Sequence, residues 1–402
     1  MNRYIMFHFG QKFRRLRNKL RWRKARKRGK TLRLRVGNIA GFLHCLNTLN
    51  IPYVVLRWFD EVPLTITEEE ECFEDIDFLI DHTRLEEVVE LSSRHPGKIK
   101  CDFYSPTGKR GTGYKKMPYY PPVMSWEILA SRKIYQDNFY VPSPEVHFKS
   151  LAYHLTYHKA TSSGIPSGTD TFPECLPAKR PYRELLEQLG DSIQLDLPKP
   201  YTLTRLHHYL QHQGWGMPYD LMTRWPKEKE WMLYTAKQEE KIFRPHAERD
   251  PNLVVFLLRA DATKDKEIMD STVALVKKHF NILKTVQLDE AMTVRILRSV
   301  RGGNWMENRG TELIPPTVAL VCRDEAPEAF APDDPRRKKY PLINNAKVLY
   351  KNDIRDTINL KFPSSKHKRI VLHASDNAME AQHHLQAVFG PQYPSVCEEL
   401  RC

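Results

Sequence analysis

Two aspartates that stand one residue apart, Asp75 and Asp77, are the part of the sequence that points most directly to chemistry. They begin the run D-I-D-F-L-I-D, which is typical of a β-strand, and side chains at i and i+2 of a strand lie on the same face of a sheet. Two adjacent carboxylates repel each other unless a positive charge lies between them. Mg²⁺ fills this role in many proteins because it prefers oxygen ligands. The pair therefore predicts a divalent metal site.

Asp102 is the third candidate ligand of this site. It lies in the apolar run I-K-C-D-F-Y, which predicts the next strand, and it can complete the cluster if the two strands are neighbours. Three carboxylates on neighbouring strands are what a two-metal phosphoryl or nucleotidyl transfer needs, because the metals clamp a triphosphate and activate the attacking hydroxyl. The structural alternative is that Asp75 and Asp77 cap a strand and Asp102 lies on the surface.

The surrounding pattern predicts the elements that must position these aspartates. Apolar residues between 36 and 49 recur at helical spacing, Pro52 ends that helix, and the run Y-V-V-L-R-W over 53–58 indicates a buried strand. An acidic loop follows over residues 59–74, and then the D-x-D strand over 75–81. A second helix is expected over 83–94 and the strand of Asp102 over 98–104. Helices that alternate with strands predict an α/β unit.

This order of elements resembles the polymerase-β-type nucleotidyltransferase superfamily. More narrowly, I-P-Y-V-V-L-R followed by E-D-I-D-F-L-I-D is similar to nucleotidyltransferase-like proteins of bacterial polysaccharide gene sets, over residues 36–159. The resemblance implies that Asp75 and Asp77 bind two Mg²⁺ ions, and that Asp102 binds the catalytic ion and helps activate the acceptor hydroxyl. It implies a nucleoside triphosphate such as ATP as donor and a sugar or sugar phosphate as acceptor, in polysaccharide biosynthesis.

One position departs from the superfamily pattern. A Gly-Gly or Gly-Ser turn after the first strand, whose backbone N–H groups hold the triphosphate, is replaced by Arg57-Trp58. Either Arg57 substitutes as a phosphate contact, or nucleotide binding has been lost or changed. Lys159 is a second candidate for reaching the phosphates. His154 and His158, at i and i+4 of a predicted helix, could offer two metal ligands, but no third ligand is evident.

A second candidate for chemistry is His373, at the end of the predicted strand R-I-V-L-H. Ser375 and Asp376 then begin a helix, so the imidazole would lie beside a helix N-terminus, where phosphate binds readily. A neutral histidine in that position can accept a phosphoryl group. The structural alternative is a histidine at a strand end that is followed by a Ser/Asp helix cap.

The stretch L-H-A-S-D-N-A-M-E-A resembles the active-site signature of nucleoside diphosphate kinases, and N-D-I-R-D at 352–356 resembles a preceding segment of that family. The resemblance covers residues 251–390. It implies a ferredoxin-like fold, a phosphohistidine at His373, and nucleotide contacts from Arg259, Arg355 and Ser375. His384 stands where the family has the glutamate that orients the histidine, so nucleotide binding without turnover is the alternative to kinase activity.

Charge is distributed unevenly along the chain. The formal net charge is +14, but residues 1–36 contain fifteen Lys/Arg and no Asp/Glu, which leaves 48 basic and 49 acidic residues in the remainder. Phe13, Leu16 and Leu20 form a thin apolar stripe at helical spacing within 12–35. This favours contact with an anionic membrane surface over contact with nucleic acid, with a solvated tail as the alternative.

Together these patterns predict a mixed α/β (α+β) protein, with a nucleotidyltransferase-like mixed sheet, a helical subdomain and a ferredoxin-like domain. The expected divisions are a basic segment, the α/β domain, mostly helical residues, the kinase-like domain and a tail, over 1–36, 37–124, 125–248, 249–392 and 393–402. No membrane span or signal peptide is expected. Seven cysteines without a C-x-x-C pair favour the cytoplasm, with peripheral attachment to the inner membrane face. Phosphoryl transfer through His373 and a non-catalytic nucleotide-binding adaptor are the alternatives to nucleotidyl transfer, and no oligomeric state follows.

Overall fold

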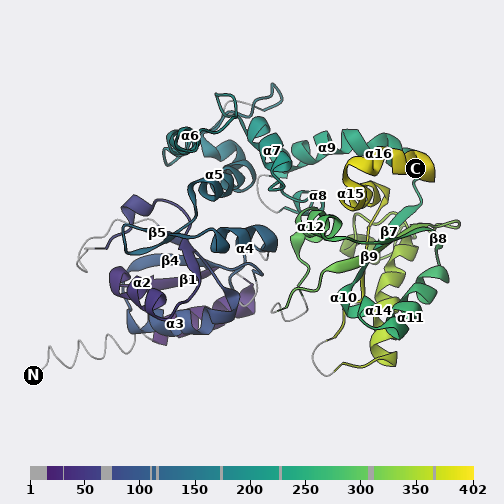
Figure 1. Ribbon diagram of the computed structural model, residues 1–402, viewed down its shortest axis with the longest axis horizontal. Helices are drawn as coiled ribbons and strands as arrows, with labels where there is room; N and C mark the ends of the chain where they lie inside the picture. The colour runs from purple at the N-terminus through teal and green to yellow at the C-terminus, as the bar shows by residue number, and fades with distance from the viewer. Residues whose placement is uncertain are drawn as a thin grey trace, which may run out of the picture. The chain divides into compact units, whose positions relative to one another are not determined.

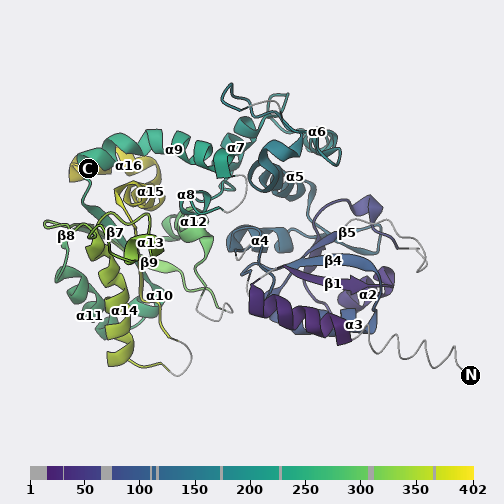
Figure 2. The ribbon, with the colours of Figure 1, turned by 180° about the vertical axis from the view of Figure 1, so that it is seen from behind.

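The computed structural model describes nine stretches of the chain, residues 16–29, 31–64, 75–108, 111–114, 117–172, 175–225, 229–306, 312–364 and 368–402. The chain divides into two compact units. Unit 1 comprises Met1–Gly216 with Pro226–Glu228, and unit 2 comprises Met217–Trp225 with Lys229–Cys402. Each unit combines helices with a β-sheet (Figure 1, and from behind in Figure 2), which confirms the coarse α/β prediction.

Unit 1 is built on a four-stranded mixed sheet of order β1-β4-β3-β2. The central strands β3 and β4 are parallel, and the two edge strands β1 and β2 are antiparallel to their neighbours. Two helices, α2 and α3, pack on one face of the sheet (Figure 1). The bounds are β1 Leu32–Val36, α2 Ile39–Thr48, β2 Tyr53–Val55, β3 Ile76–Ile80, α3 Leu85–Arg94 and β4 Ile99–Tyr104.

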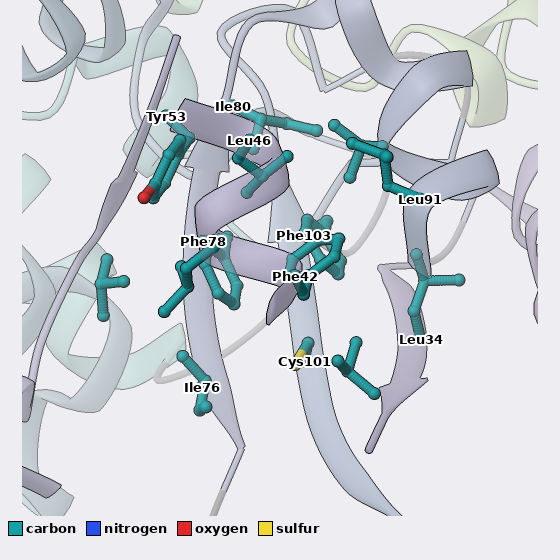
Figure 3. Close-up of a cluster of buried hydrophobic side chains, with 14 of the residues drawn as sticks. Leu34, Phe42, Leu46, Tyr53, Ile76, Phe78, Ile80, Leu91, Cys101 and Phe103 are labelled. Atoms are coloured by element: carbon teal, nitrogen blue, oxygen red, sulfur yellow. The ribbon is translucent and has the colours of Figure 1, made fainter. Parts of the chain in front are cut away.

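The core of unit 1 lies between this sheet and its two helices. Figure 3 shows Phe42 and Leu46 of α2 over Phe78 of β3 and Phe103 of β4. The rings of Phe78 and Phe103 stack with centroids 5.0 Å apart, and Phe42 meets both edge-on. Because side chains alternate along a strand, the residues between these apolar ones must point to the opposite face.

The sheet begins earlier than the expected boundary at residue 37. Leu32, Leu34 and Val36 of β1 are fully buried and alternate with arginines, so the end of the predicted basic segment is an edge strand. Residues 16–28 form a helix whose Asn18 donates to the carbonyls of Arg35 and Ser92. The apolar stripe predicted for this segment lies on the exposed side of the helix, since Leu16 and Leu20 are 53% and 49% exposed. Phe13 and the rest of 1–15 lie outside the described residues.

The residues from 122 onward in unit 1 are mainly helical, as the pattern predicted. They include a two-stranded hairpin that the sequence analysis missed, β5 Lys133–Tyr135 with β6 Phe139–Val141. The helices are α4 Pro122–Ala130, α5 Pro144–Tyr153, α6 Tyr182–Ser192 and α7 Leu203–His212. The two later helices of the expected helical subdomain, α8 Tyr219–Met222 and α9 Lys229–Arg249, belong to unit 2.

Unit 2 contains a four-stranded antiparallel sheet of order β10-β7-β9-β8. Every residue of β7 is buried because α11 and α14 cover one face of the sheet and α15 covers the other (Figure 1). Residues 393–400, expected as part of a tail, form α16, and its Cys397 is fully buried. The bounds are β7 Leu253–Arg259, α11 Lys266–Lys277, β8 Asn281–Gln287, α12 Glu290–Ser299, β9 Pro316–Arg323, α14 Tyr350–Lys361, β10 Leu372–Ala374, α15 Ala378–Phe389 and α16 Tyr393–Leu400.

Candidate functional site

The three aspartates lie on the face of the unit 1 sheet that is opposite to α2 and α3. Asp77 of β3 and Asp102 of β4 are direct partners in the parallel register, and Arg33 of β1 is the antiparallel partner of Asp102. Asp75 precedes β3 by one residue and shares the face of Asp77 by alternation. The two strands are therefore neighbours, and the aspartates share one sheet face.

Arginines pair with all three carboxylates. Arg33 donates from Nε and Nη2 to the two oxygens of Asp102 at 2.7 and 2.6 Å, and its Nη2 also lies 2.7 Å from Oδ2 of Asp75. Arg57 Nη2 lies 2.5 Å from Oδ2 of Asp77. The positive charge that must separate such carboxylates comes here from guanidinium groups.

The three aspartates do not form a compact ligand set. Among the described residues, only His373, Glu380 and His384 of unit 2 form a group of three His, Cys, Asp or Glu side chains with ligand atoms all within 4.8 Å of one another. Asp102 is 5% exposed, and both of its oxygens are bound by Arg33. Burial raises the pKa of Asp102 and outweighs the hydrogen bonds from Arg33, which lower it. In this arrangement Asp102 is a partner of Arg33.

Asp75 and Asp77 open onto a cavity of about 340 Å³. Two of the residues predicted to contact phosphate, Arg57 and Lys159, lie on the same cavity although they are far apart in the sequence. Asp102 is not among the residues that line it. The full lining is Arg57, Trp58, Asp75, Asp77, Lys100, Tyr104, Tyr114, Tyr119, His154, His158, Lys159 and Tyr182.

Arg57 is placed in the cavity by the end of β2. The backbone N–H of Leu56 donates to the carbonyl of Asp77, which extends the strand pairing, and Trp58 then turns the chain in a left-handed conformation with φ 56°. The Arg57 side chain is 5% exposed, and its Nη1 is buried without a hydrogen-bond partner in the described part of the chain. Burial alone would lower the pKa of Arg57, but Tyr119 and Asp77 raise it well above its usual value, so the group stays charged.

Lys159 reaches the cavity from the end of α5, which continues as a wide π-helical turn over His154–Lys159. Such turns are rare and often occur at functional sites. The two histidines of this turn are occupied by aromatic neighbours. His154 Nδ1 lies 2.6 Å from the hydroxyl of Tyr119, and the ring of His158 stacks on Tyr114 with centroids 5.2 Å apart. In the described residues they belong to no three-residue metal group.

The residues predicted to contact phosphate in unit 2 bond mainly to the protein backbone. Arg259 is fully buried and donates to the carbonyls of Ile314, Trp305 and Met306. Arg355 donates from Nε and Nη2 to the carbonyl of Leu372 and from Nη1 to Asn352. Ser375 Oγ accepts from the N–H of Val255 at 3.1 Å. Motif similarity identified these positions, but the structure uses them to hold loops and strands together.

His373 lies within β10, where it pairs with Leu257 of β7, and one of its ring nitrogens lies within 4.8 Å of a carboxylate oxygen of Glu380 in the first turn of α15. Its neighbours Leu372 and Ala374 belong to the core under α11 and α14, so His373 faces the side of the sheet that α15 covers. Burial, His384 and Arg301 hold the pKa of His373 well below its usual value, and the imidazole is therefore neutral.

Two cations that surround Asp75, Arg33 and Lys100, were not predicted from the sequence. The signal for Arg33 is the alternation L-R-L-R-V over 32–36, which indicates a strand with arginines on one face. No family model matches the chain, and neither a curated protein nor a solved structure matches it. The chemistry of unit 1 therefore rests on its own geometry, a cavity with carboxylates on one wall and cations and aromatic rings around it.

Proposed function

We propose that the cavity of unit 1 binds a nucleoside triphosphate with Mg²⁺ and transfers its nucleotidyl group to a hydroxyl or phosphate acceptor. The observation that carries the proposal is the meeting of two carboxylates on one sheet face with three cations, Arg57, Lys100 and Lys159, in one cavity. Cations bind the phosphates of a nucleotide, and carboxylates bind the metal that accompanies them. The surrounding tyrosines and Trp58 offer flat apolar faces to a base or a sugar ring.

Asp75 and Asp77 fit a divalent cation in donor type and in position, because both offer carboxylate oxygens to the cavity. When bound, Mg²⁺ would neutralise phosphate charge and lower the pKa of an attacking hydroxyl. Arg57 would hold its positive charge at the cavity wall beside Asp77, and Lys159 would supply a second positive charge. Asp102 would act as a positioning residue, since it fixes Arg33, which in turn contacts Asp75.

The arrangement of elements supports the two resemblances. In unit 1 the D-x-D strand β3 lies between β2 and the strand that carries Asp102, as expected for a nucleotidyltransferase-like domain. In unit 2 the strand order β10-β7-β9-β8, with α11 and α14 as crossover helices, fits a ferredoxin-like domain of the nucleoside diphosphate kinase kind. A sugar or sugar-phosphate acceptor from polysaccharide biosynthesis is the acceptor class that the first resemblance favours.

The basic helix over residues 16–28 supports attachment to an anionic membrane surface. Leu16 and Leu20, which are one helical turn apart, are exposed beside several arginines and lysines. Among the described residues, no helix has the length and apolar character needed to cross a membrane. We therefore propose a cytoplasmic protein with peripheral contact to the inner membrane face, to be tested by co-sedimentation with anionic and neutral vesicles.

Nucleotide-dependent thermal stabilisation of the full chain tests the proposed function. The wild type should gain melting temperature with a nucleoside triphosphate plus Mg²⁺. Asp75→Asn and Lys159→Met should lose most of this gain, because each removes a charge from the cavity wall. Lys133→Met, which changes an exposed lysine of β5, is the matched control and should behave as wild type.

A nucleotide shift of equal size in Asp75→Asn, Lys159→Met and wild type would place the nucleotide elsewhere and contradict the proposal. If the nucleotide does bind in the cavity, release of pyrophosphate when a sugar phosphate is added would identify the reaction as nucleotidyl transfer. Asp75→Asn should lose this release. Nucleotide binding without pyrophosphate release for any acceptor would favour the non-catalytic adaptor.

A further inference from the structure

We propose that His373, Glu380 and His384 of unit 2 form a binding site for a divalent transition metal, with Zn²⁺ as its natural occupant. The inference is independent of the cavity in unit 1. It uses His373 as a metal ligand, and it therefore competes with the prediction that the same histidine carries a phosphoryl group.

The three side chains come from two elements that face each other. Glu380 and His384 stand at positions i and i+4 of α15, so they lie on the same face of the helix. His373 points from β10 toward the face of the sheet that α15 covers, because it pairs with Leu257 while Leu372 and Ala374 face the opposite core. One ligand atom from each side chain lies within 4.8 Å of the other two.

The distances fit a metal better than they fit hydrogen bonds. Glu380 Oε1 and His384 Nε2 lie 3.9 Å apart, which is too far for a hydrogen bond. A tetrahedral Zn²⁺ with bonds of about 2.0–2.2 Å holds its ligand atoms about 3.3–3.5 Å apart. The side chains would therefore have to close by only about 1 Å around the ion, which small χ rotations supply.

The ligand atoms are also buried and without partners. Nε2 of His373, Oε1 of Glu380 and Nε2 of His384 make no hydrogen bond within the described residues. Buried polar groups are almost always hydrogen-bonded, and three such atoms close together need an explanation. A bound metal supplies it, because it satisfies one atom from each side chain at once.

The second oxygen of the carboxylate is already oriented for this role. Glu380 Oε2 accepts from the backbone N–H of Asp376 at 2.6 Å, and such outer contacts hold a metal ligand in place. Asp376 itself is bound by Lys351 and Arg224 at 2.5 and 2.9 Å. The arrangement leaves Oε1 directed toward the two imidazoles.

Electrostatics around the site act in both directions. Burial first, and then His384, Arg301, Lys351 and Arg355, hold the pKa of His373 well below its usual value, and burial lowers the pKa of His384 to about 3. The cations would oppose a metal ion. Burial above all, and then Asp376 and Asp220, raise the pKa of Glu380 to about 8, and the negative charges of Asp376 and Asp220 offset part of the repulsion between the cations and a metal ion. Two histidines and one glutamate are a known ligand set of Zn²⁺, and three protein ligands leave a fourth position for water or a substrate.

Titration of the full chain with Co²⁺ and Zn²⁺ tests the proposal. Co²⁺ should bind with a stoichiometry of one, give the visible absorption of a four-coordinate site, and be displaced by Zn²⁺. Glu380→Gln and His384→Gln should each weaken Zn²⁺ binding at least 100-fold. His383→Gln is the matched control, because His383 is a buried histidine of the same helix that packs on Tyr219 and Phe243. Its affinity should stay within 3-fold of wild type.

A measurement on proteins with an intact ligand set covers the case in which the ligand variants do not fold. The ring of Trp305 lies 5.9 Å from that of His373, so Co²⁺ should quench the fluorescence of Trp305, and Trp305→Phe should lose that quenching while it retains Co²⁺ binding. The proposal is overturned if the wild type shows no visible Co²⁺ band, or if His383→Gln weakens binding as much as His384→Gln. Transfer of ³²P from labelled ATP to His373 in metal-free protein would also overturn it.

Discussion

Replacing Asp77 by asparagine should destabilise unit 1, because it leaves the charge of Arg57 buried without a counterion. The Arg57 side chain is 5% exposed and that of Asp77 is 19% exposed, and their closest atoms are 2.5 Å apart. Removing one partner of a buried ion pair costs about 3–5 kcal/mol. Because the asparagine oxygen still accepts a hydrogen bond and the position is partly exposed, we expect the lower end, about 3 kcal/mol.

The double substitution Arg57→Met/Asp77→Leu separates stability from function. Apolar side chains of similar volume often replace a buried ion pair at little or no cost, so this variant should recover most of the stability that Asp77→Asn loses. Measured against the single variants Arg57→Met and Asp77→Leu, the coupling free energy between the two positions should be at least about 2 kcal/mol. The same variant should show no nucleotide-dependent stabilisation, because the cavity has lost one carboxylate and one guanidinium group proposed to contact phosphate.

Urea unfolding and thermal melting of the full chain measure these effects. A loss of about 3 kcal/mol corresponds to a decrease of about 6–12 °C in melting temperature for a unit of this size. Asp191→Asn, which breaks the exposed pair of Asp191 and Lys199, is the control and should leave the midpoint of unfolding close to that of the wild type. A cost below about 1 kcal/mol for Asp77→Asn, or a double variant no more stable than the single one, would refute the view that Arg57 depends on Asp77.

Arg33→Met should cost about 2 kcal/mol in urea unfolding, because Asp102 loses both of its hydrogen bonds while its side chain stays 8% exposed; an unchanged midpoint would argue against this pairing. Arg259→Met should destabilise unit 2 by about 3 kcal/mol, because it leaves three backbone carbonyls without their donors. It should not alter nucleotide binding, and a selective loss of nucleotide binding would support the phosphate contact predicted from the sequence. Burial lowers the pKa of His147 to about 3, so between about pH 6.5 and pH 3 only the unfolded chain takes up the proton. The contribution of neutral His147 to the free energy of unfolding is therefore fully present above about pH 6.5 and is lost as the pH falls. Relative to His147→Phe, the wild type should lose about 2.5 kcal/mol between pH 6.5 and 4.5, and parallel stability curves would exclude this.

The sequence predicted the sheet face of the aspartates because alternation is a local property. The D-I-D run placed Asp75 and Asp77 on one side, and the neighbouring strand brought Asp102 beside them. The arginine partners could not be predicted in this way. Whether Arg33 meets Asp102 depends on an edge strand that pairs with a strand about 70 residues later, and such register is set by the whole sheet and not by either segment.

Arg259 and Ser375 show a different limit, that of motif similarity. A motif places a residue type at a position, but it says nothing of the hydrogen bonds that the backbone around it needs. Arg259 is fully buried beside three carbonyls, and it is used to satisfy them. Ser375 in turn closes the pairing between β10 and β7. The sequence located the strands correctly and could not distinguish a ligand contact from a structural hydrogen bond.

The balance of charge around the cavity determines the order in which its ligands can bind. Among the described residues that line the cavity or pair with its aspartates, the cations of residues 33, 57, 100 and 159 exceed the carboxylates of residues 75, 77 and 102 by one. A free Mg²⁺ ion would add to this excess and would compete with Arg33 for Asp75, whereas a magnesium nucleotide is an anion and would reduce it. The metal is therefore expected to enter with the nucleotide. Mg²⁺ alone should leave the melting temperature unchanged. If Mg²⁺ without nucleotide raises the melting temperature of the wild type but not that of Asp75→Asn, the carboxylates bind the metal by themselves, and the expected order of binding is wrong.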